Sequence, residues 1–520
     1  MHVVLVHPPT IASVTTLSQE AVPPLGLAYV AGALRADGQR VTVVDAVGEA
    51  LDQLAIYPRA RASMLRGLSF DEIVARIPAD ATLIGVSCMF SNAWCPTRDL
   101  VERIHEAFPG VPIALGGEHA TACWELVLRT CEAVTFCVLG EGERTLCELS
   151  RCLDEGSDPR LVPGVAARAP GGAPGLAPPD APIPLKRARI RDIDAIAEPY
   201  WEAFPLEKYI DGHYNHGVVR GRSMPILASR GCPYRCTFCS SPRMWTTKWV
   251  VRSPRELVAE MKRCIERYRV NDFAFYDLTA IIRRDWLVEF CTLLLDEKLD
   301  ITWQLPSGTR SEAIDGEVAT LLFASGCKNI NYAPESGSPR ELERIQKRVN
   351  LGRMLRSMRD AARAGIDVKV NIILGFPDET LSDVLRTYAF LARCAIAGAE
   401  AVSIFPFCAY PGSEMHDEMV AKGSVRMDDD YFLGLVFTDY THVTAYGAGR
   451  SAALLRAAVL LGIVWFHAVQ TVAHPSRTLD IVRQLTRRTQ NSKVANAIEP
   501  MRRRRAAYRK LRAEPTGPRG

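Results

Sequence analysis

Short apolar runs alternate with amphipathic stretches in two separate blocks of this 520-residue chain. Continuous apolar runs joined by helical segments are typical of a parallel sheet that helices cover on both faces. The first block spans residues 2–150, and its apolar runs are Val3–Val6, Val41–Val44, Leu83–Ser87, Ile113–Leu115 and Val134–Leu139. We therefore predict a doubly wound α/β domain at the N-terminus, with any ligand at the carboxyl ends of its strands.

The second block, from Pro225 to Pro411, repeats the strand and helix unit six times. Six such units predict a partial or full (β/α) barrel, whose chemistry lies at the carboxyl ends of the strands. Proline and glycine crowd residues 156–184 between the blocks, a composition that resists regular structure and marks a linker. The predicted boundaries are 1–152 for the first domain, 153–200 for the linker, 201–415 for the barrel and 416–520 for a mainly helical C-terminal region.

Composition places the chain among ordinary soluble proteins, because 48% of its residues are apolar and 23% are charged. The net charge of +4, from 63 Lys and Arg against 59 Asp and Glu, is too small to argue for a nucleic-acid partner. The 15 cysteines are an odd number, and the first residues do not have the pattern of a secretory signal. We therefore expect reduced thiols in the cytoplasm.

Three cysteines follow the first strand of the predicted barrel with the spacing C-x3-C-x2-C, namely Cys232, Cys236 and Cys239. Their thiolates can converge on one small cluster, and Gly231 and Pro233 permit tight wrapping of the loop. Three ligands leave the fourth iron of a [4Fe-4S] cluster open to a chelating ligand, so the spacing indicates a reactive cluster rather than a purely structural one. A structural zinc loop is the alternative, but it needs four ligands, and no partner C-x2-C or H-x3-H pair occurs elsewhere.

This loop resembles the signature of the radical S-adenosylmethionine (SAM) superfamily, and its place after the first barrel strand matches that fold. The resemblance implies that the three cysteines are both the metal ligands and the catalytic centre, with SAM on the open iron. Residues 333–338 and 371–380 resemble the strand-end segments that contact SAM in relatives. The candidate residues around the cluster and SAM are Phe238, Asp277, Arg310, Glu335, Ser336 and Gly375. For Arg310, pairing with the methionine carboxylate and a surface salt bridge are both open.

An α/β domain placed before such a barrel resembles the Rossmann-like, cobalamin-binding domain of the B12-dependent radical SAM class. The resemblance implies that residues at the strand ends approach the corrin and its nucleotide tail. The candidate cobalamin contacts are Ser87, Gly116, Gly117, Gly140 and Glu141. The chain lacks the Asp-x-His-x-x-Gly motif of many cobalamin domains, so the lower axial position is either open or filled by another residue. A degenerate domain without cobalamin is the alternative, and His119 is expected to be a wall residue rather than a metal ligand.

The resemblance implies an enzyme that uses the cluster and SAM to generate a 5′-deoxyadenosyl radical, most simply for methylation of an unactivated carbon. The expected substrate is a secondary-metabolite or lipid-like small molecule, and the expected electron donor is a flavodoxin- or ferredoxin-type protein. One alternative is radical cyclisation, oxidation, rearrangement or carbon–carbon coupling without methyl transfer. Another, from a different class, is a non-catalytic sensor that binds cobalamin or an iron–sulfur cluster.

Beyond Tyr410 the pattern changes to an apolar helix over Leu454–Val472 and a basic tail over Arg502–Arg512. The continuous apolar run Ala457–Phe466 is short for a membrane span of about 20 residues, so we predict a buried or interfacial helix. Together with the tail, it favours a hydrophobic substrate and peripheral contact with the inner face of the membrane. A solvated helix face is the alternative for the tail.

Overall fold

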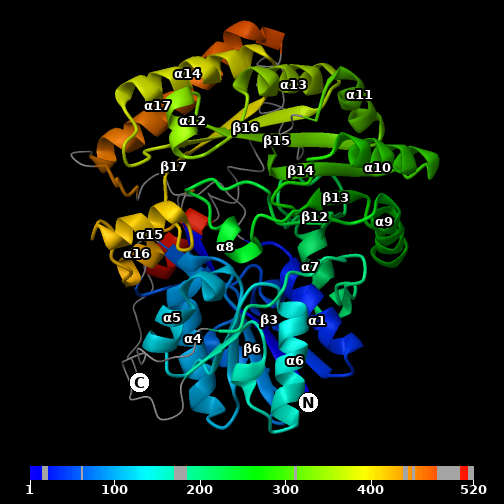
Figure 1. Cartoon of the computed structure of the whole chain (residues 1–520), viewed down its shortest axis with the longest axis vertical. Helices are drawn as coiled ribbons and strands as arrows, with labels where there is room; N and C mark the ends of the chain where they lie inside the picture. The colour runs from blue at the N-terminus through cyan, green and yellow to red at the C-terminus, as the bar shows by residue number, and fades with distance from the viewer. Residues whose placement is uncertain are drawn as a thin grey trace.

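The structure is a computed structural model of the chain, and it describes residues 1–13, 21–59, 63–168, 184–309, 313–436, 438, 443–447, 451–476 and 504–512. Two α/β units are stacked on each other (Figure 1). The N-terminal domain, blue to cyan, forms one half of the molecule, and the barrel, green to yellow, forms the other.

The sheet of the N-terminal domain confirms the predicted doubly wound architecture. Its strand order is β3-β1-β6-β7-β8-β9, and all neighbours are parallel except β8 and β9. Val3 and Leu5 pack on one face against the first and sixth helices, whereas Val4 and Val6 pack on the other against the fourth and fifth. The strands are β1 (His2–His7), β3 (Arg40–Asp45), β6 (Leu83–Ser87), β7 (Ile113–Gly116), β8 (Phe136–Val138) and β9 (Val165–Ala167).

Four longer helices cover this sheet, and shorter elements complete the domain. The helices are α1 (Leu25–Ala36), α4 (Trp94–Ala107), α5 (Glu118–Thr130), α6 (Gly142–Asp154), α2 (Ala46–Glu49) and α3 (Phe70–Val74), with the 3-10 turns η1 (Ser91–Ala93) and η2 (Pro159–Leu161). A separate antiparallel sheet has the order β2-β5-β4, with β2 (Thr10–Ser13), β5 (Ser63–Arg66) and β4 (Leu54–Ile56).

The expected linker 153–200 is not structureless in its first part. β9 lies within it and pairs antiparallel with β8, which extends the sheet of the first domain by one strand. Residues 169–183 are outside the described part of the chain. After them come the 3-10 turn η3 (Trp201–Ala203) and helix α7 (Leu206–Asp211), which lead into the barrel.

Six parallel strands form the second sheet, in the sequential order β10-β13-β14-β15-β16-β17, which confirms the predicted six-unit partial barrel. Strand β16 buries Val368, Val370, Ile372 and Leu374 in alternation with less buried residues, because successive side chains point to opposite faces. The strands are β10 (Ser223–Ile226), β13 (Asp272–Phe275), β14 (Thr302–Thr309), β15 (Cys327–Glu335), β16 (Asp367–Leu374) and β17 (Ala401–Pro406).

Helices form the outer layer of the barrel in Figure 1. They are α9 (Pro254–Tyr268), α10 (Arg284–Asp296), α11 (Gly316–Ala324), α12 (Pro339–Arg344), α13 (Leu351–Arg363) and α14 (Leu381–Ile396). The largest group of buried apolar residues includes Val3 and Leu25 of the first domain and Met224 and Phe273 of the barrel. Both domains therefore share one continuous apolar core.

The C-terminal region is helical where the structure describes it, with α15 (Glu414–Ala421), α16 (Asp429–Leu433) and α17 (Ala452–Ala473). Helix α17 packs on α14 and β17 through Leu455, Val459 and Phe466. By length and composition, α17 is apolar enough to cross a membrane. It extends beyond the predicted Leu454–Val472 at both ends.

Candidate active site at the junction of the two domains

The cysteine loop leaves the barrel after the short strand β11 (Ser229–Arg230), which pairs antiparallel with β12 (Val250–Val251). Gly231 has φ +84°, and a Cβ atom there would lie 2.4 Å from the carbonyl oxygen of Lys248. Glycine is therefore needed for the chain to turn into the loop. Cys232, Cys236 and Cys239 are all partly exposed, whereas every other cysteine except Cys408 is buried.

The three thiols fit an iron–sulfur cluster better than a single metal ion. No group of three or more His, Cys, Asp or Glu side chains in the described residues is close enough to hold one ion. A cube-shaped cluster does not need that closeness, because each thiolate binds a different iron. Burial raises the pKa of the Cys239 thiol to about 12, and coordination to iron would overcome this by deprotonating it.

The loop is held in place by the barrel and by the C-terminal region. The backbone N–H of Thr237 donates to the Ile345 carbonyl over 3.1 Å, and the Met415 N–H donates to the Thr237 carbonyl over 2.9 Å. The ring of Phe238 packs edge-on against Phe376, with 5.7 Å between centroids. Gly375 and Phe376 directly follow β16, so this contact joins the cysteine loop to the end of that strand. Contact of Phe238 with a cofactor stays a prediction.

Asp277 holds the start of the cysteine loop through its carboxylate. Oδ2 accepts from the Ala228 N–H over 3.1 Å, and Oδ1 accepts from the Ser229 hydroxyl over 2.6 Å. Burial raises the pKa of Asp277 to about 6. Asp277 therefore positions the residues before the loop, and its predicted contact with the cofactor stays a prediction.

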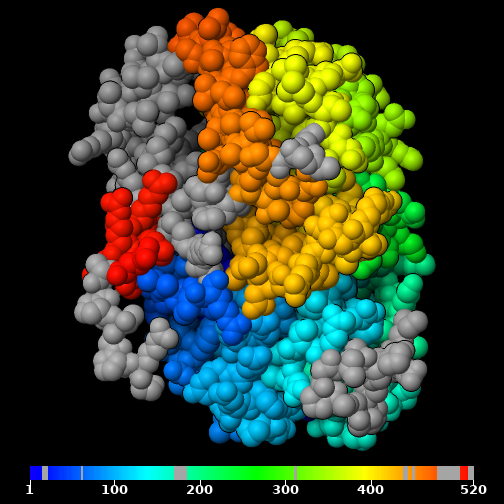
Figure 2. Space-filling model, turned by 90° about the vertical axis from the view of Figure 1, so that its left-hand side faces the viewer, coloured from blue at the N-terminus to red at the C-terminus, as the bar shows by residue number. Residues whose placement is uncertain are grey.

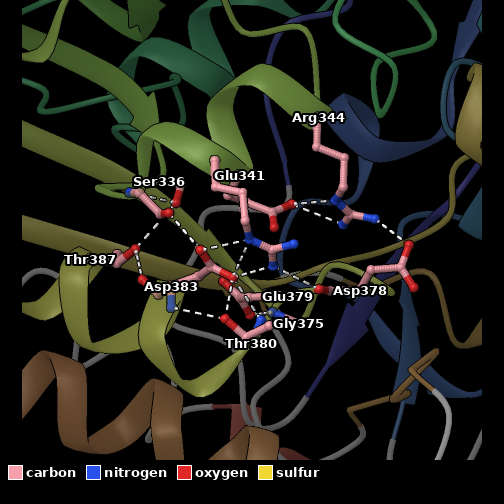
Figure 3. Close-up of polar contacts among 11 residues, drawn as sticks. Ser336, Glu341, Arg344, Gly375, Asp378, Glu379, Thr380, Asp383 and Thr387 are labelled. Carbon is pink, nitrogen blue, oxygen red and sulfur yellow. Dashed lines mark hydrogen bonds and ion pairs between the residues drawn. The ribbon is translucent and has the colours of Figure 1, made fainter.

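The ends of β15 and β16 lie together in a dense polar network (Figure 3). Glu335 ends β15 with φ +67° and accepts from Lys347 Nζ over 2.9 Å. The Ser336 hydroxyl lies 3.2 Å from that of Thr387. Gly375 directly follows β16 and has φ +92°, and its N–H donates to Glu379 Oε2 over 2.7 Å. The structure thus brings together three predicted SAM contacts, whereas Arg310 lies outside the described residues.

Asp383, which sequence reasoning missed, is the centre of this network. Its carboxylate accepts from the Ser338 hydroxyl over 2.6 Å and caps the N-terminus of α14 by accepting from the Thr380 N–H over 2.8 Å. The Arg340 guanidinium also bonds to it and holds the pKa of Asp383 well below its usual range. The capping pattern of Thr380 followed by Asp383 is the sequence signal that could have revealed it.

The strand ends of the N-terminal domain form an edge with little side-chain cover. Gly117 has φ +111°, and a Cβ atom there would lie 2.5 Å from the Cys88 carbonyl oxygen, whereas a Cβ atom on Gly116 would meet no atom within 4 Å. The Gly140 N–H donates to the Thr121 hydroxyl over 2.9 Å. Met89 and Phe90, just after Ser87, are 44% and 65% exposed. Open backbone beside exposed apolar side chains fits a large, flat ligand such as a corrin.

The carboxylate of Glu141 is bonded within the protein, and its predicted contact with cobalamin stays a prediction. Its carboxylate accepts from Arg189 Nε over 2.9 Å, from the Ile190 N–H over 2.8 Å and from Arg230 over 3.3 Å. Arg230 also bonds to Glu143 over 2.6 Å, and it directly precedes Gly231. Glu141 therefore connects the first domain to the base of the cysteine loop.

A second link between the domains lies on the other side of the loop. The Ser240 hydroxyl, next to Cys239, donates to Glu118 at the start of α5. His119 is fully buried, stacks on Trp94 with 5.1 Å between centroids, and has its pKa lowered to about 3 by burial. This agrees with the expected wall role of His119. The links place the cysteine loop against the open strand edge of the N-terminal domain.

Two family models match the chain. Residues 13–150 match the B12 binding domain, and residues 226–391 match the radical SAM superfamily. An uncharacterized methyltransferase of Pyrococcus horikoshii is 28% identical over 425 residues, which are 81% of this chain and 84% of the relative. The cytidylyl-2-hydroxyethylphosphonate methyltransferase of Streptomyces wedmorensis is 27% identical over 434 residues, 79% of this chain and 80% of the relative. The anaerobic magnesium-protoporphyrin IX monomethyl ester cyclase of Rubrivivax gelatinosus is 27% identical over 371 residues, 70% of this chain and 61% of the relative.

Solved structures show the same fold. The radical SAM methyltransferase TsrM of Kitasatospora setae, solved with cobalamin and a [4Fe-4S] cluster, has a TM-score of 0.61 at 20% identity and covers 82% of this chain and 79% of its own. The cobalamin-dependent SAM radical enzyme OxsB has a TM-score of 0.60 at 16% identity and covers 85% of this chain and 58% of its own. Both alignments extend over more than four fifths of this chain.

Proposed function

Because residues 226–391 match the radical SAM superfamily and residues 13–150 match the B12 binding domain, we propose that the chain is a cobalamin-dependent radical SAM enzyme that methylates an unactivated carbon of a small molecule. One observation carries the proposal: the cysteine loop and the open strand edge of the N-terminal domain lie against each other. The loop of Cys232, Cys236 and Cys239 is tied by Arg230 and Ser240 to the strand-end edge of the B12-binding domain. Methyltransferases among the relatives support the reaction type.

The proposed roles follow from where the residues lie. Cys232, Cys236 and Cys239 would hold the cluster, and the ends of β15 and β16, with Glu335, Ser336 and Gly375, would lie along SAM. On the facing edge, Ser87, Gly116, Gly117 and Gly140 would lie along cobalamin. When bound, the cluster and SAM supply a 5′-deoxyadenosyl radical and cobalamin supplies a methyl carrier.

The chain's own residues orient the groups that react and exclude water from the site. Asp277 anchors Ala228 and Ser229 and so places the loop at the mouth of the barrel. The Phe238–Phe376 contact closes the loop against β16 with apolar surface. A radical at an unactivated carbon reacts with most groups it meets, so an enclosed, apolar and rigid setting directs it to one partner.

The test is anaerobic reconstitution with iron, sulfide and cobalamin, followed by measurement of SAM cleavage and of label from the SAM methyl group. We expect 5′-deoxyadenosine to form and methyl label to be recovered with the corrin. Single Cys232→Ala, Cys236→Ala and Cys239→Ala variants should lose both cluster iron and cleavage, whereas Cys264→Ala, at a buried position on helix α9, should keep both. Cleavage that persists in the three loop variants would refute the assignment of the cluster.

Radical ring formation without methyl transfer is the second candidate, because the cyclase of Rubrivivax gelatinosus aligns with 70% of this chain. It predicts 5′-deoxyadenosine but no methyl label on the corrin. A flavodoxin- or ferredoxin-type donor is proposed for either reaction, and replacement of dithionite by a reduced flavodoxin in the same assay tests it.

We further propose that the protein is cytoplasmic and contacts a membrane surface through α17, which favours a hydrophobic substrate. Figure 2 shows α17, in orange, on the surface of the barrel half. Leu461 and Val464 on its outer side are 61% and 64% exposed, and Arg509 and Lys510 add exposed positive charge in the C-terminal segment. Leu461→Glu and Val464→Glu together should lower flotation with anionic liposomes, because they replace exposed apolar side chains with charges that the anionic surface repels. Leu381→Glu, at a comparably exposed site on α14, is the control and should not.

A further inference from the structure

Four histidines lie in residues 1–152, and they differ in where the fold puts them. His2 starts β1, at the edge opposite the strand ends, and bonds to Asp80 and Thr42. His105 is exposed near the end of α4, and His119 is fully buried beneath Trp94. His7 ends β1, and its side chain is 21% exposed. His7 is therefore the histidine that combines the ligand-binding edge with an accessible ring.

The position of His7 is in line with the candidate cobalamin contacts. Strand β1 is parallel to β6, and the register pairs Val6 with Val86, so His7 and Ser87 end neighbouring strands. Ser87 in turn pairs with Gly116 of β7. The side chain of His7 thus belongs to the same carboxyl edge as Ser87 and Gly116, where an α/β sheet of this kind binds its ligand.

A buried carboxylate orients the ring of His7. Nδ1 lies 2.7 Å from Asp45 Oδ1, and Asp45 is side by side with His7 in the β1–β3 register. The Asp45 side chain is completely buried and also accepts from the Tyr209 hydroxyl over 2.9 Å and from the Gly48 N–H over 3.0 Å. Because an ionised carboxylate can only accept, Nδ1 is the donor of this hydrogen bond, which leaves Nε2 as the ring nitrogen free to bind a metal when the ring is neutral.

Gly48 shows how closely this group is packed. A Cβ atom at Gly48 would lie 2.5 Å from Asp45 Oδ2 and 2.5 Å from the ring of Tyr209. Any larger residue would displace Asp45, which bonds to His7, or Tyr209, which bonds to Asp45. A histidine whose second nitrogen is held by a buried carboxylate is the usual arrangement of a metal-ligating imidazole, because the carboxylate sets the tautomer and raises the basicity of the ligand nitrogen.

We propose that His7 Nε2 is the protein ligand on the lower face of the cobalt of bound cobalamin, with Asp45 and Tyr209 as positioning residues. The proposal rests on the proposed cobalamin site. It assigns the lower axial position without the Asp-x-His-x-x-Gly motif: the carboxylate comes from the neighbouring strand β3, 38 residues along the chain, rather than from the residues around the histidine.

The test is electron paramagnetic resonance of the cob(II)alamin-loaded full chain, because a nitrogen bound to Co(II) splits the cobalt lines. Protein grown with ¹⁵N-histidine separates two sources of that nitrogen. A histidine ligand then gives doublets in place of the ¹⁴N triplets, whereas the cofactor's own base keeps triplets. We expect doublets in the wild type, which needs no variant to fold.

Two variants and one control complete the experiment. His7→Gln should lose the doublets while it retains cobalamin, and Asp45→Asn should lower the fraction of cobalt that shows them. His105→Gln, on the exposed end of α4, should keep the wild-type spectrum. The role of His7 would be overturned if cobalamin bound to the ¹⁵N-histidine wild type gives triplets or no nitrogen splitting. It would also be overturned if the doublets survive in His7→Gln. An unchanged fraction in Asp45→Asn would overturn the positioning role of Asp45. Failure of the wild type to bind any cobalamin would instead overturn the proposed cobalamin site, and this inference with it.

Discussion

Removal of Arg230 should destabilise the junction between the two domains far more than removal of a surface arginine. Arg230 is 5% exposed in its side chain and bonds to Glu143 over 2.6 Å and to Glu141 over 3.3 Å, with the ring of Tyr29 5.2 Å away. In Arg230→Met, Glu141 keeps its bonds from Arg189 and Ile190. Glu143, only 7% exposed, loses the one cation to which it bonds among the described residues.

Breaking a buried ion pair from one side costs about 3–5 kcal/mol, because the remaining charge is left uncompensated. At about 1.4 kcal/mol per tenfold change, the lower figure is a change of roughly 100-fold in the equilibrium constant for unfolding. A second substitution that removes the orphaned charge, Arg230→Met with Glu143→Gln, should recover at least about 1 kcal/mol of this loss. Arg103→Met is the matched control, because its partner Asp71 is 79% exposed and the pair should contribute less than about 1 kcal/mol.

The assay is anaerobic urea unfolding of the cluster-free protein, followed by tryptophan fluorescence and far-ultraviolet circular dichroism. The free energy of unfolding in the first transition should be highest in Arg103→Met, lower in the double variant and lowest in Arg230→Met. The reasoning is refuted if Arg230→Met costs no more than Arg103→Met, or if the double variant is no more stable than Arg230→Met alone.

Three further outcomes follow from single side chains. Burial raises the pKa of Asp277 to about 6, so its ionisation removes up to about 3 kcal/mol of stability as pH rises from 4 to 6. Asp277→Asn should gain stability relative to wild type across that range, and a constant difference in urea midpoints would contradict this. For His119 the sign is opposite: burial lowers its pKa to about 3, so wild type should lose stability as pH falls from 6.5 to 3. His119→Phe, which keeps the stacking on Trp94, should flatten this loss in a pH series of thermal melts. Gly375→Ala should cost about 1–3 kcal/mol in urea unfolding, because φ is +92° and the added Cβ would lie 2.5 Å from a Leu455 methyl group. Gly110→Ala, where a Cβ meets no atom within 4 Å, should be neutral.

Much of the architecture could be predicted because it is encoded in contiguous residues. The runs Val3–Val6 and Leu83–Val86 contain no polar side chain, which a strand needs only when both faces of its sheet are covered. The six strand and helix units of the barrel are readable for the same reason. The spacing of Cys232, Cys236 and Cys239 indicates cluster chemistry because all three ligands come from one loop, so no knowledge of the fold is required.

The C-terminal helix shows where local pattern is ambiguous. The apolar composition of α17 fits a buried helix, an interfacial helix and a membrane span alike. In the structure it packs on α14 and β17 through one stripe and leaves Leu461 and Val464 outside. Whether such a helix is buried or exposed depends on the elements that pack against it, and these come from other parts of the chain.

The two α/β units, their order and the cysteine loop are readable from the sequence, since each depends on periodicity or spacing within a few residues. The pairing of polar groups depends on the tertiary structure. Glu141 joins Arg230 across 89 residues, and His7 meets Asp45 across 38. A carboxylate at a strand end can bind a cofactor, a cation or a backbone N–H with equal local propensity. The packing of strands and domains selects among them, because each buried charge must find its partner within hydrogen-bond distance.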